Sequence, residues 1–167
     1  HVESHVHICH VSTRGAVEIV RLAKRRGLPV TAEVTPHHLL LTEDLAATYD
    51  PRYKVNPPLR TADDVAALQA GLADGTIDAV ATDHAPHPVE DKDCEWDAAA
   101  FGMLGLETAL SVVQATMVET GLISSSDVAD RLSAAPARIG RCNSGDAAQG
   151  RPLAAGEPAK DRVVPRT

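Results

Sequence analysis

Residues 5–36 read HVHICHVSTRGAVEIVRLAKRRGLPVTAEVTP and contain three successive patterns. Polar and apolar side chains alternate over 5–11, as they do in a strand whose two faces differ. Apolar residues then recur at helical spacing from Ala16 onwards and stop before Gly27. Residues 29–35 are rich in β-branched side chains, which indicates a second strand. This order predicts a parallel β/α unit, because two parallel strands need a crossover long enough to hold a helix.

The same order of patterns continues along the chain. Thr61 is suited to cap a helix that stops at Gly75, and 77–83 is expected to form a third strand parallel to the first two. The acidic segment 88–97 is expected to be a loop. Three consecutive units of this kind favour a β/α barrel or a doubly wound sheet, so the sequence predicts the α/β fold class.

The remaining segments are expected to close this unit or to lie outside it. Residues 106–120 and 126–139 are expected to form two closing helices, with Pro136 bending or ending the second. Residues 142–167 are rich in Gly, Pro, Ala and Arg and show no periodicity, so we expect an irregular tail there. The folded unit is then expected to cover residues 1–141.

The composition of the 167 residues limits the classes of partner. Hydrophobic residues make up 44% and charged residues 23%, as in ordinary globular proteins. The formal net charge of -7, without any run of Lys or Arg, argues against nucleic acid and membrane surfaces, since both need a clustered basic face. No apolar stretch approaches the roughly 20 residues that cross a bilayer. We therefore expect a small-molecule substrate and a cytoplasmic location, and a homo-oligomer is left open.

Metal-ligating residue types stand at the carboxyl ends of the predicted strands. His10 follows the first strand and Asp83 ends the third. These ends of parallel strands meet at one edge, where reactive groups gather. Neutral imidazole and carboxylate are usual ligands of hydrolytic zinc, which lowers the pKa of a bound water to about 7. Taken singly, each residue could equally be a hydrogen-bonded strand-end histidine or a helix-capping aspartate, and at least one further ligand is needed.

Three other histidines lie near these strand ends. His37 and His38 follow the second strand, but adjacent side chains of an extended segment point opposite ways, so a structural role is favoured for both. His87 comes after the rigid Ala85–Pro86 step and can fold back over the third strand, which makes it the better candidate for substrate contact.

Two loops add further candidate substrate contacts. Asn56 precedes Pro57 and Pro58, whose fixed φ stiffens the loop, although Asn before Pro is also a common way to start a turn. Gly102 follows Phe101 and has no Cβ, so a ligand could approach the backbone closely there.

Five motifs together resemble the dihydroorotases of the bacterial class I type, in the family's order and across about residues 5–141. They are HICHVST (7–13), AEVTPHHLLLT (32–42), YKVNPPLR (53–60), DGTIDAVATDHAPH (74–87) and FGMLGLETAL (101–110). The resemblance implies an eight-stranded (β/α)8 barrel of the TIM type with a two-zinc centre and a small β-sandwich. This chain would supply a partial barrel covering about strands six to eight and the closing helices.

The resemblance also implies roles for single residues. His10 matches the ligand of the second zinc. Asp83 matches the aspartate that binds the first zinc and carries the proton when N-carbamoyl-L-aspartate and dihydroorotate interconvert in pyrimidine synthesis. The positions that match substrate contacts are Asn56, His87, Phe101 and Gly102.

Other parts of the family's site have no counterpart in this sequence. They are the first-strand H-x-H pair, the bridging aspartate of strand four, the fifth-strand histidine and the arginine that holds the substrate carboxylate. We therefore expect the chain to be truncated relative to the family and inactive on its own. The alternatives are a non-catalytic dihydroorotase-like paralogue or partner-binding chain and, among enzymes, a dihydropyrimidinase or allantoinase.

Overall fold

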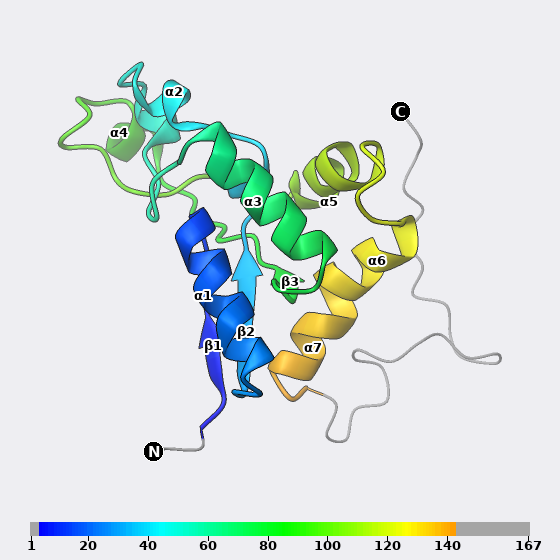
Figure 1. Cartoon of the computed structure of the whole chain (residues 1–167). Coiled ribbons are helices and arrows are strands. Elements are labelled where there is room, and N and C mark those ends of the chain that lie inside the picture. Colours follow the sequence, from blue (N-terminus) through cyan, green and yellow to red (C-terminus); the bar gives the residue numbers. More distant parts are fainter. Residues whose placement is uncertain (1–3, 143–167) are drawn as a thin grey trace.

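A three-stranded parallel sheet lies at the centre of the computed structural model, which describes residues 4–142 (Figure 1). The strands are β1 (Val6–Ile8), β2 (Val30–Val34) and β3 (Ala79–Val80), in the order β1-β2-β3. In the register, His7 pairs with Thr31, and Val34 pairs with Val80. The prediction of parallel neighbouring strands is confirmed.

The strands are shorter than the sequence patterns predicted. The extended runs expected over 5–11 and 77–83 do not continue to their last residues, because His10 and Asp83 have left-handed backbones, with φ of 54° and 47°. A left-handed residue turns the chain out of the extended conformation. Single backbone hydrogen bonds to β2 still continue past the strand ends, such as Val11 N to Glu33 O at 2.9 Å.

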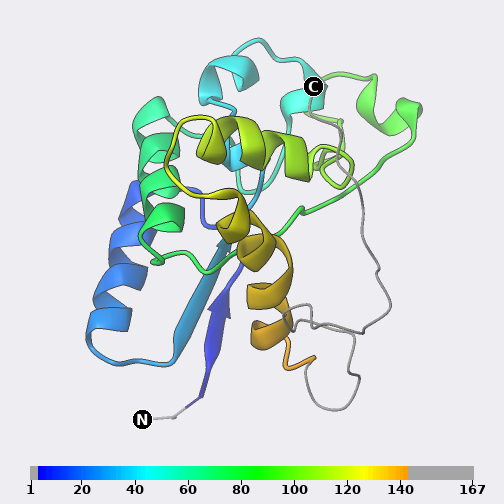
Figure 2. The same ribbon diagram turned by 90° about the vertical axis from the view of Figure 1, so that its right-hand side faces the viewer.

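Two helices cover one face of the sheet and lie side by side (Figures 1 and 2). The helix α1 (Arg14–Arg25) is capped by Thr13, whose hydroxyl accepts from Ala16 N. The helix α3 (Ala62–Ala73) is capped by Thr61, as predicted. The two helices approach closely at Gly71, where a Cβ would lie 2.9 Å from Val17 Cγ1.

The closing helices follow the predicted positions but are not regular. The first expected helix begins later than residue 106, with α5 (Ala109–Val113), and widens into the π-helical turn η3 (Gln114–Val118). The second consists of α6 (Ser125–Ala129), the π-helical turn η4 (Asp130–Ala134) and α7 (Ala135–Ile139). Pro136 therefore lies in the first turn of α7 and does not end the helix. A proline lacks the N–H for an i to i−4 bond, so the irregular turn just before it is expected.

Four short helices lie between the longer elements. The acidic segment 88–97 contains α4, which corrects its assignment as a loop. None of the four exceeds four residues, and so short an element has no helical periodicity to detect. They are η1 (His37–Leu39), α2 (Glu43–Ala46), η2 (Pro51–Tyr53) and α4 (Val89–Lys92).

The core lies between the sheet and the helices. Its largest fully buried side chains include Leu39, Leu68, Leu72, Ile77 and Met117. Among residues 4–142, no helix has the length and apolar character needed to cross a bilayer. The tail predicted for 142–167 lies outside the described residues, apart from Cys142.

Candidate metal centre

His10 and Asp83 meet above the carboxyl end of the sheet. His10 follows β1 and Asp83 follows β3, so the two residues flank β2. His10 Nε2 lies 3.6 Å from Asp83 Oδ1, and the side chains are 30% and 26% exposed. This distance confirms the prediction that the two side chains meet at one edge of the sheet. A shared metal ion or reacting group could contact both, since zinc bonds to these ligand atoms are about 2 Å long.

Both residues hold an unusual backbone conformation. Left-handed φ values are uncommon for residues other than glycine, even for the Asn, Asp and His residues that adopt them more often than most, and each such position costs on the order of 1–3 kcal/mol. His10 and Asp83 are two of four non-glycine residues with positive φ in the part of the chain that the structure describes. Their occurrence together at one strand edge is typical of a functional site.

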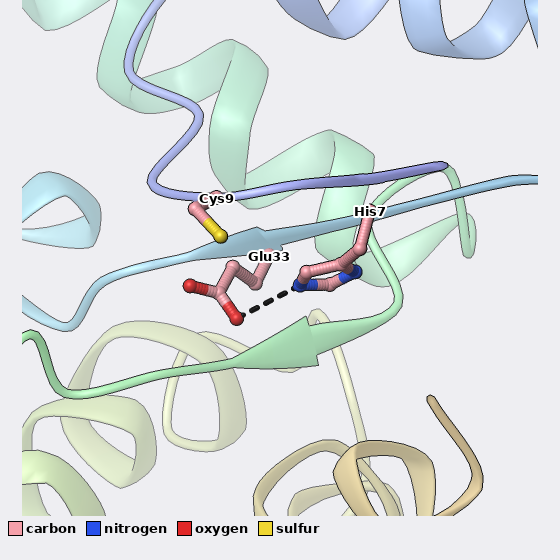
Figure 3. Close-up of side chains that lie close together, drawn as sticks. All are labelled: His7, Cys9 and Glu33. Carbon is pink, nitrogen blue, oxygen red and sulfur yellow. Dashed lines mark hydrogen bonds and ion pairs between the residues drawn. The ribbon is translucent and has the colours of Figure 1, made fainter. Parts of the chain in front are cut away.

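Glu33 lies beside this pair, on the face of β2 turned away from α1 and α3. Its Oε2 accepts from His7 Nε2 at 3.0 Å, and its Oε1 lies 3.1 Å from His10 Nδ1. The second contact is short but not aligned as a hydrogen bond, and His10 Nδ1 is buried. Figure 3 shows Glu33 with His7 and Cys9, whose ligand-type atoms all lie within 4.8 Å of one another.

The Cys9 thiol next to Glu33 is biased toward its protonated form. Burial raises its pKa above 9.0, and the negative charges of Glu33 and Asp83 act in the same direction. A thiol is a far weaker metal ligand than a thiolate. Metal binding through this sulfur would therefore require the thiol to lose its proton.

His38 is buried and has both ring nitrogens engaged. Its Nε2 lies 3.0 Å from the Pro57 carbonyl, which can only accept, so Nε2 carries the proton. Its Nδ1 then accepts from the Thr35 hydroxyl at 2.7 Å. Burial lowers the pKa of His38. This ring ties the loop that carries Asn56 to the end of β2, which is the structural role that the sequence favoured.

His37 is a buried, neutral histidine. It is 6% exposed, and burial, followed by the nearby His38 and His10 rings, lowers its pKa to about 3. Neither of its ring nitrogens has a hydrogen-bond partner among residues 4–142. It lies against His38, with the ring centroids 4.6 Å apart.

Three of the four predicted substrate contacts lie together. His87 Nε2 lies 2.8 Å from the Phe101 carbonyl, to which it donates. Gly102 has a φ of 132°, and a Cβ there would lie 2.6 Å from the Ala85 Cβ. The fourth residue, Asn56, is exposed on its loop before a cis Asn56–Pro57 bond.

A pocket of about 330 Å³ opens beside these residues. The backbone around it is held by hydrogen bonds: Gly102 N donates to the Lys54 carbonyl at 3.0 Å, and Lys92 Nζ donates to the Gly102 carbonyl at 2.9 Å. The Gly102 N–H is thus already engaged. The pocket is lined by Arg52, Ala85, Pro86, His87, Lys92, Gly102, Met103 and Leu104.

The side-chain atoms that meet at the carboxyl edge of the sheet suit zinc. An imidazole nitrogen and a carboxylate oxygen face each other, and both are common zinc ligands. They supply two ligands, whereas a catalytic zinc ion takes three from protein. The described residues therefore fit part of a zinc site and call for further ligands.

Comparison with known proteins gives close relatives. No protein-family model matches the chain. It is 69% identical over 164 residues to the dihydroorotase of Streptomyces coelicolor, covering 98% of this chain and 37% of that protein. It is 68% identical over 160 residues to the dihydroorotase of Leifsonia xyli subsp. xyli, covering 96% of this chain and 36% of that protein. The chain belongs to the dihydroorotase family. It spans a little over a third of the length of these curated relatives.

Solved structures of related hydrolases share the fold of this chain. The L-hydantoinase (dihydropyrimidinase) from Arthrobacter aurescens superposes with a TM-score of 0.76 at 34% identity, covering 82% of this chain and 31% of that one. The arrangement of strands and helices is thus that of cyclic-amide hydrolases outside the dihydroorotase family as well.

Sequence reasoning overlooked two residues of this site. In the sequence, Glu33 looks like an ordinary polar position of a strand. Its role depends on the strand register, which pairs His7 with Thr31 and so places Glu33 two residues beyond that pair on β2. Lys92 lies in a segment expected to be a loop, yet its ammonium group binds three backbone carbonyls, those of Lys54, Ala100 and Gly102. Only the folding of α4 brings it there.

Proposed function

We propose that residues 1–141 form the part of a dihydroorotase that supplies strands six to eight of a (β/α)8 barrel. The whole enzyme would interconvert N-carbamoyl-L-aspartate and dihydroorotate in pyrimidine synthesis. The observation that carries this proposal is the 3.6 Å approach of His10 Nε2 to Asp83 Oδ1 at the carboxyl edge of the sheet. Active sites of β/α barrels lie at this edge.

His10 and Asp83 would each hold one of two zinc ions in the complete site. When bound, zinc supplies Lewis-acid chemistry and makes a nucleophile available near neutral pH. The Asp83 carboxylate would accept the proton of the attacking water and deliver it to the departing ring nitrogen. His10 would act only as a ligand.

The substrate would lie against the loops that follow β3. His87 would contact it from the rim, with its ring oriented by the Phe101 carbonyl. Phe101 and Gly102 would shape the wall, and Asn56 would reach it from the stiff loop tied to His38. Lys92 lines the same pocket, and its positive charge suits a substrate that carries carboxylates, whereas Arg52, which also lines it, is paired with Asp50.

A second candidate is another cyclic-amide hydrolase activity: that of a hydantoinase or dihydropyrimidinase, or that of an allantoinase. The 34% identity to the L-hydantoinase over 82% of this chain supports this second candidate. A non-catalytic chain that pairs with a partner barrel is the third possibility. The two enzyme candidates differ in the cyclic amide that they open, and the non-catalytic chain opens none.

The experiment is a substrate panel on the full-length, zinc-loaded protein that carries this segment. Turnover of dihydroorotate is compared with that of dihydrouracil, hydantoin and allantoin. We expect dihydroorotate to be the preferred substrate. Preference for another ring would replace the dihydroorotase assignment, and lack of turnover with all four would support the non-catalytic alternative.

A further inference from the structure

We propose that Glu33 is a positioning residue, which fixes the orientation and tautomer of His10 so that Nε2 faces the metal. The proposal rests on the zinc site described under Proposed function. It concerns a residue that neither the sequence motifs nor the comparisons assign a role.

A continuous chain of polar contacts leads from the sheet to the candidate metal centre. The Thr31 hydroxyl lies 2.8 Å from His7 Nδ1, and His7 Nε2 lies 3.0 Å from Glu33 Oε2. Glu33 Oε1 lies 3.1 Å from His10 Nδ1, and His10 Nε2 lies 3.6 Å from Asp83. The strand register sets this spacing, because His7 pairs with Thr31 and Glu33 lies two residues farther along β2.

The chemistry of the carboxylate decides where the protons lie. An ionised carboxylate only accepts, so each imidazole that faces Glu33 must present an N–H to it. His7 then offers the lone pair of Nδ1 to the Thr31 hydroxyl, and that hydroxyl accepts from His5 Nε2 at 3.1 Å. His10 keeps its proton on Nδ1, and its Nε2 lone pair faces Asp83.

Burial makes Glu33 hard to replace in this role. Its side chain is 13% exposed, and the buried His10 Nδ1 has no hydrogen bond among residues 4–142, so that Glu33 Oε1, 3.1 Å away, is the acceptor that faces it. A buried N–H that loses its acceptor is costly, on the order of 1–3 kcal/mol. Histidine ligands of zinc generally donate their second N–H to such an acceptor, which fixes the ring.

The same residues could be read as a separate metal site, since His7, Cys9 and Glu33 come within 4.8 Å of one another (Figure 3). The contacts favour the positioning role. Both ring nitrogens of His7 are already engaged, and both oxygens of Glu33 face an imidazole. A metal there would have to break the bond between His7 and Glu33.

The test uses Glu33→Gln in the full-length enzyme, with Cys9→Ser as the matched control. A glutamine is the same size, but it cannot accept from both histidines because one end of its amide donates. We expect the zinc affinity, measured by chelator competition, to fall by about 10- to 100-fold in Glu33→Gln and to stay within about twofold in Cys9→Ser. In Glu33→Gln, kcat should fall while KM changes little, because His10 and not the substrate loops is disturbed.

Three results would overturn the proposal. One is unchanged zinc affinity in Glu33→Gln. Another is the loss of a zinc equivalent in Cys9→Ser, which would show a metal ion at His7, Cys9 and Glu33. If Glu33→Gln does not fold, ¹⁵N NMR of the histidines in the unaltered enzyme decides, since a His10 proton on Nε2 contradicts the role. Zinc affinity and tautomer are read without turnover, so they stay informative even if the enzyme does not act on dihydroorotate.

Discussion

His10 Nε2 and Asp83 Oδ1 lie 3.6 Å apart although the residues follow the two outer strands of the sheet. Each has a left-handed backbone, with φ of 54° and 47°. The chain therefore turns at the end of both outer strands, and the two side chains meet over the end of β2. A change in either residue should act on the same chemical step.

Asp83→Asn in the full-length enzyme should remove nearly all turnover. Asparagine keeps the shape and an acceptor oxygen but cannot take up and deliver a proton, and general acid–base catalysis is worth about 10²–10⁴-fold. Steady-state kinetics should show the loss in kcat, with a much smaller change in KM. Asp63→Asn is the control, because Asp63 is an exposed carboxylate on α3. Retention of more than about a tenth of the activity would disprove the proton-carrying role.

The isolated 167-residue chain should show no dihydroorotase activity with added zinc. Residues 4–142 offer His10 and Asp83 at the strand edge, fewer than the three protein ligands that a catalytic zinc ion takes. The described sheet also ends in β1 and β3 as edge strands, and Val6 is 53% exposed. Open edges with apolar side chains promote association. Light scattering and turnover assays check both points, and a zinc-dependent, active monomer would contradict them.

Gly102→Ala should destabilise the enzyme by about 1–3 kcal/mol and lower its activity, because the backbone is strained for any other residue and the site is crowded. The φ of 132° is open to glycine, and the new Cβ would lie 2.6 Å from the Ala85 Cβ and 3.1 Å from His87 Nε2. Urea unfolding and kinetics measure the effect. Gly15→Ala serves as control, since nothing lies within 4 Å of a Cβ at Gly15. Equal stability of the two variants would rule out the close approach at Gly102.

Stability should fall as the pH drops from about 6.5 toward 3, in part because of His37. Its pKa is lowered from 6.5 to about 3 in the folded chain, mainly by burial. Between these values the unfolded chain binds a proton that the folded chain does not, so the free energy of unfolding decreases with falling pH. Above pH 6.5 both forms are neutral and the contribution is absent. The slope for one such group is at most about 1.4 kcal/mol per pH unit.

The measurement is urea unfolding of the full-length enzyme at a series of pH values between 4.5 and 7.5. The variant His37→Gln removes the titrating group while keeping a polar side chain of similar length. We expect its stability to depend less steeply on pH below 6.5 than that of the unaltered protein. Identical slopes would mean that His37 titrates normally in the folded state.

Local patterns were enough to predict the parallel β/α units, the cap of α3, and the edge at which His10 and Asp83 meet. These features follow from periodicity and capping chemistry, which act over a few neighbouring residues. The relatives at 68% and 69% identity are named dihydroorotases, which is the family that the five motifs resemble.

Tertiary structure alone decided the rest. The strand register brought Glu33 between His7 and His10, and the fold of α4 placed Lys92 on three backbone carbonyls. The left-handed turns at His10 and Asp83 shortened the strands, and the π-helical turns kept Pro136 inside a helical run. These outcomes depend on which distant residues share one face or one buried space. Sequence periodicity reports how each segment can fold, whereas packing between segments determines what its side chains touch.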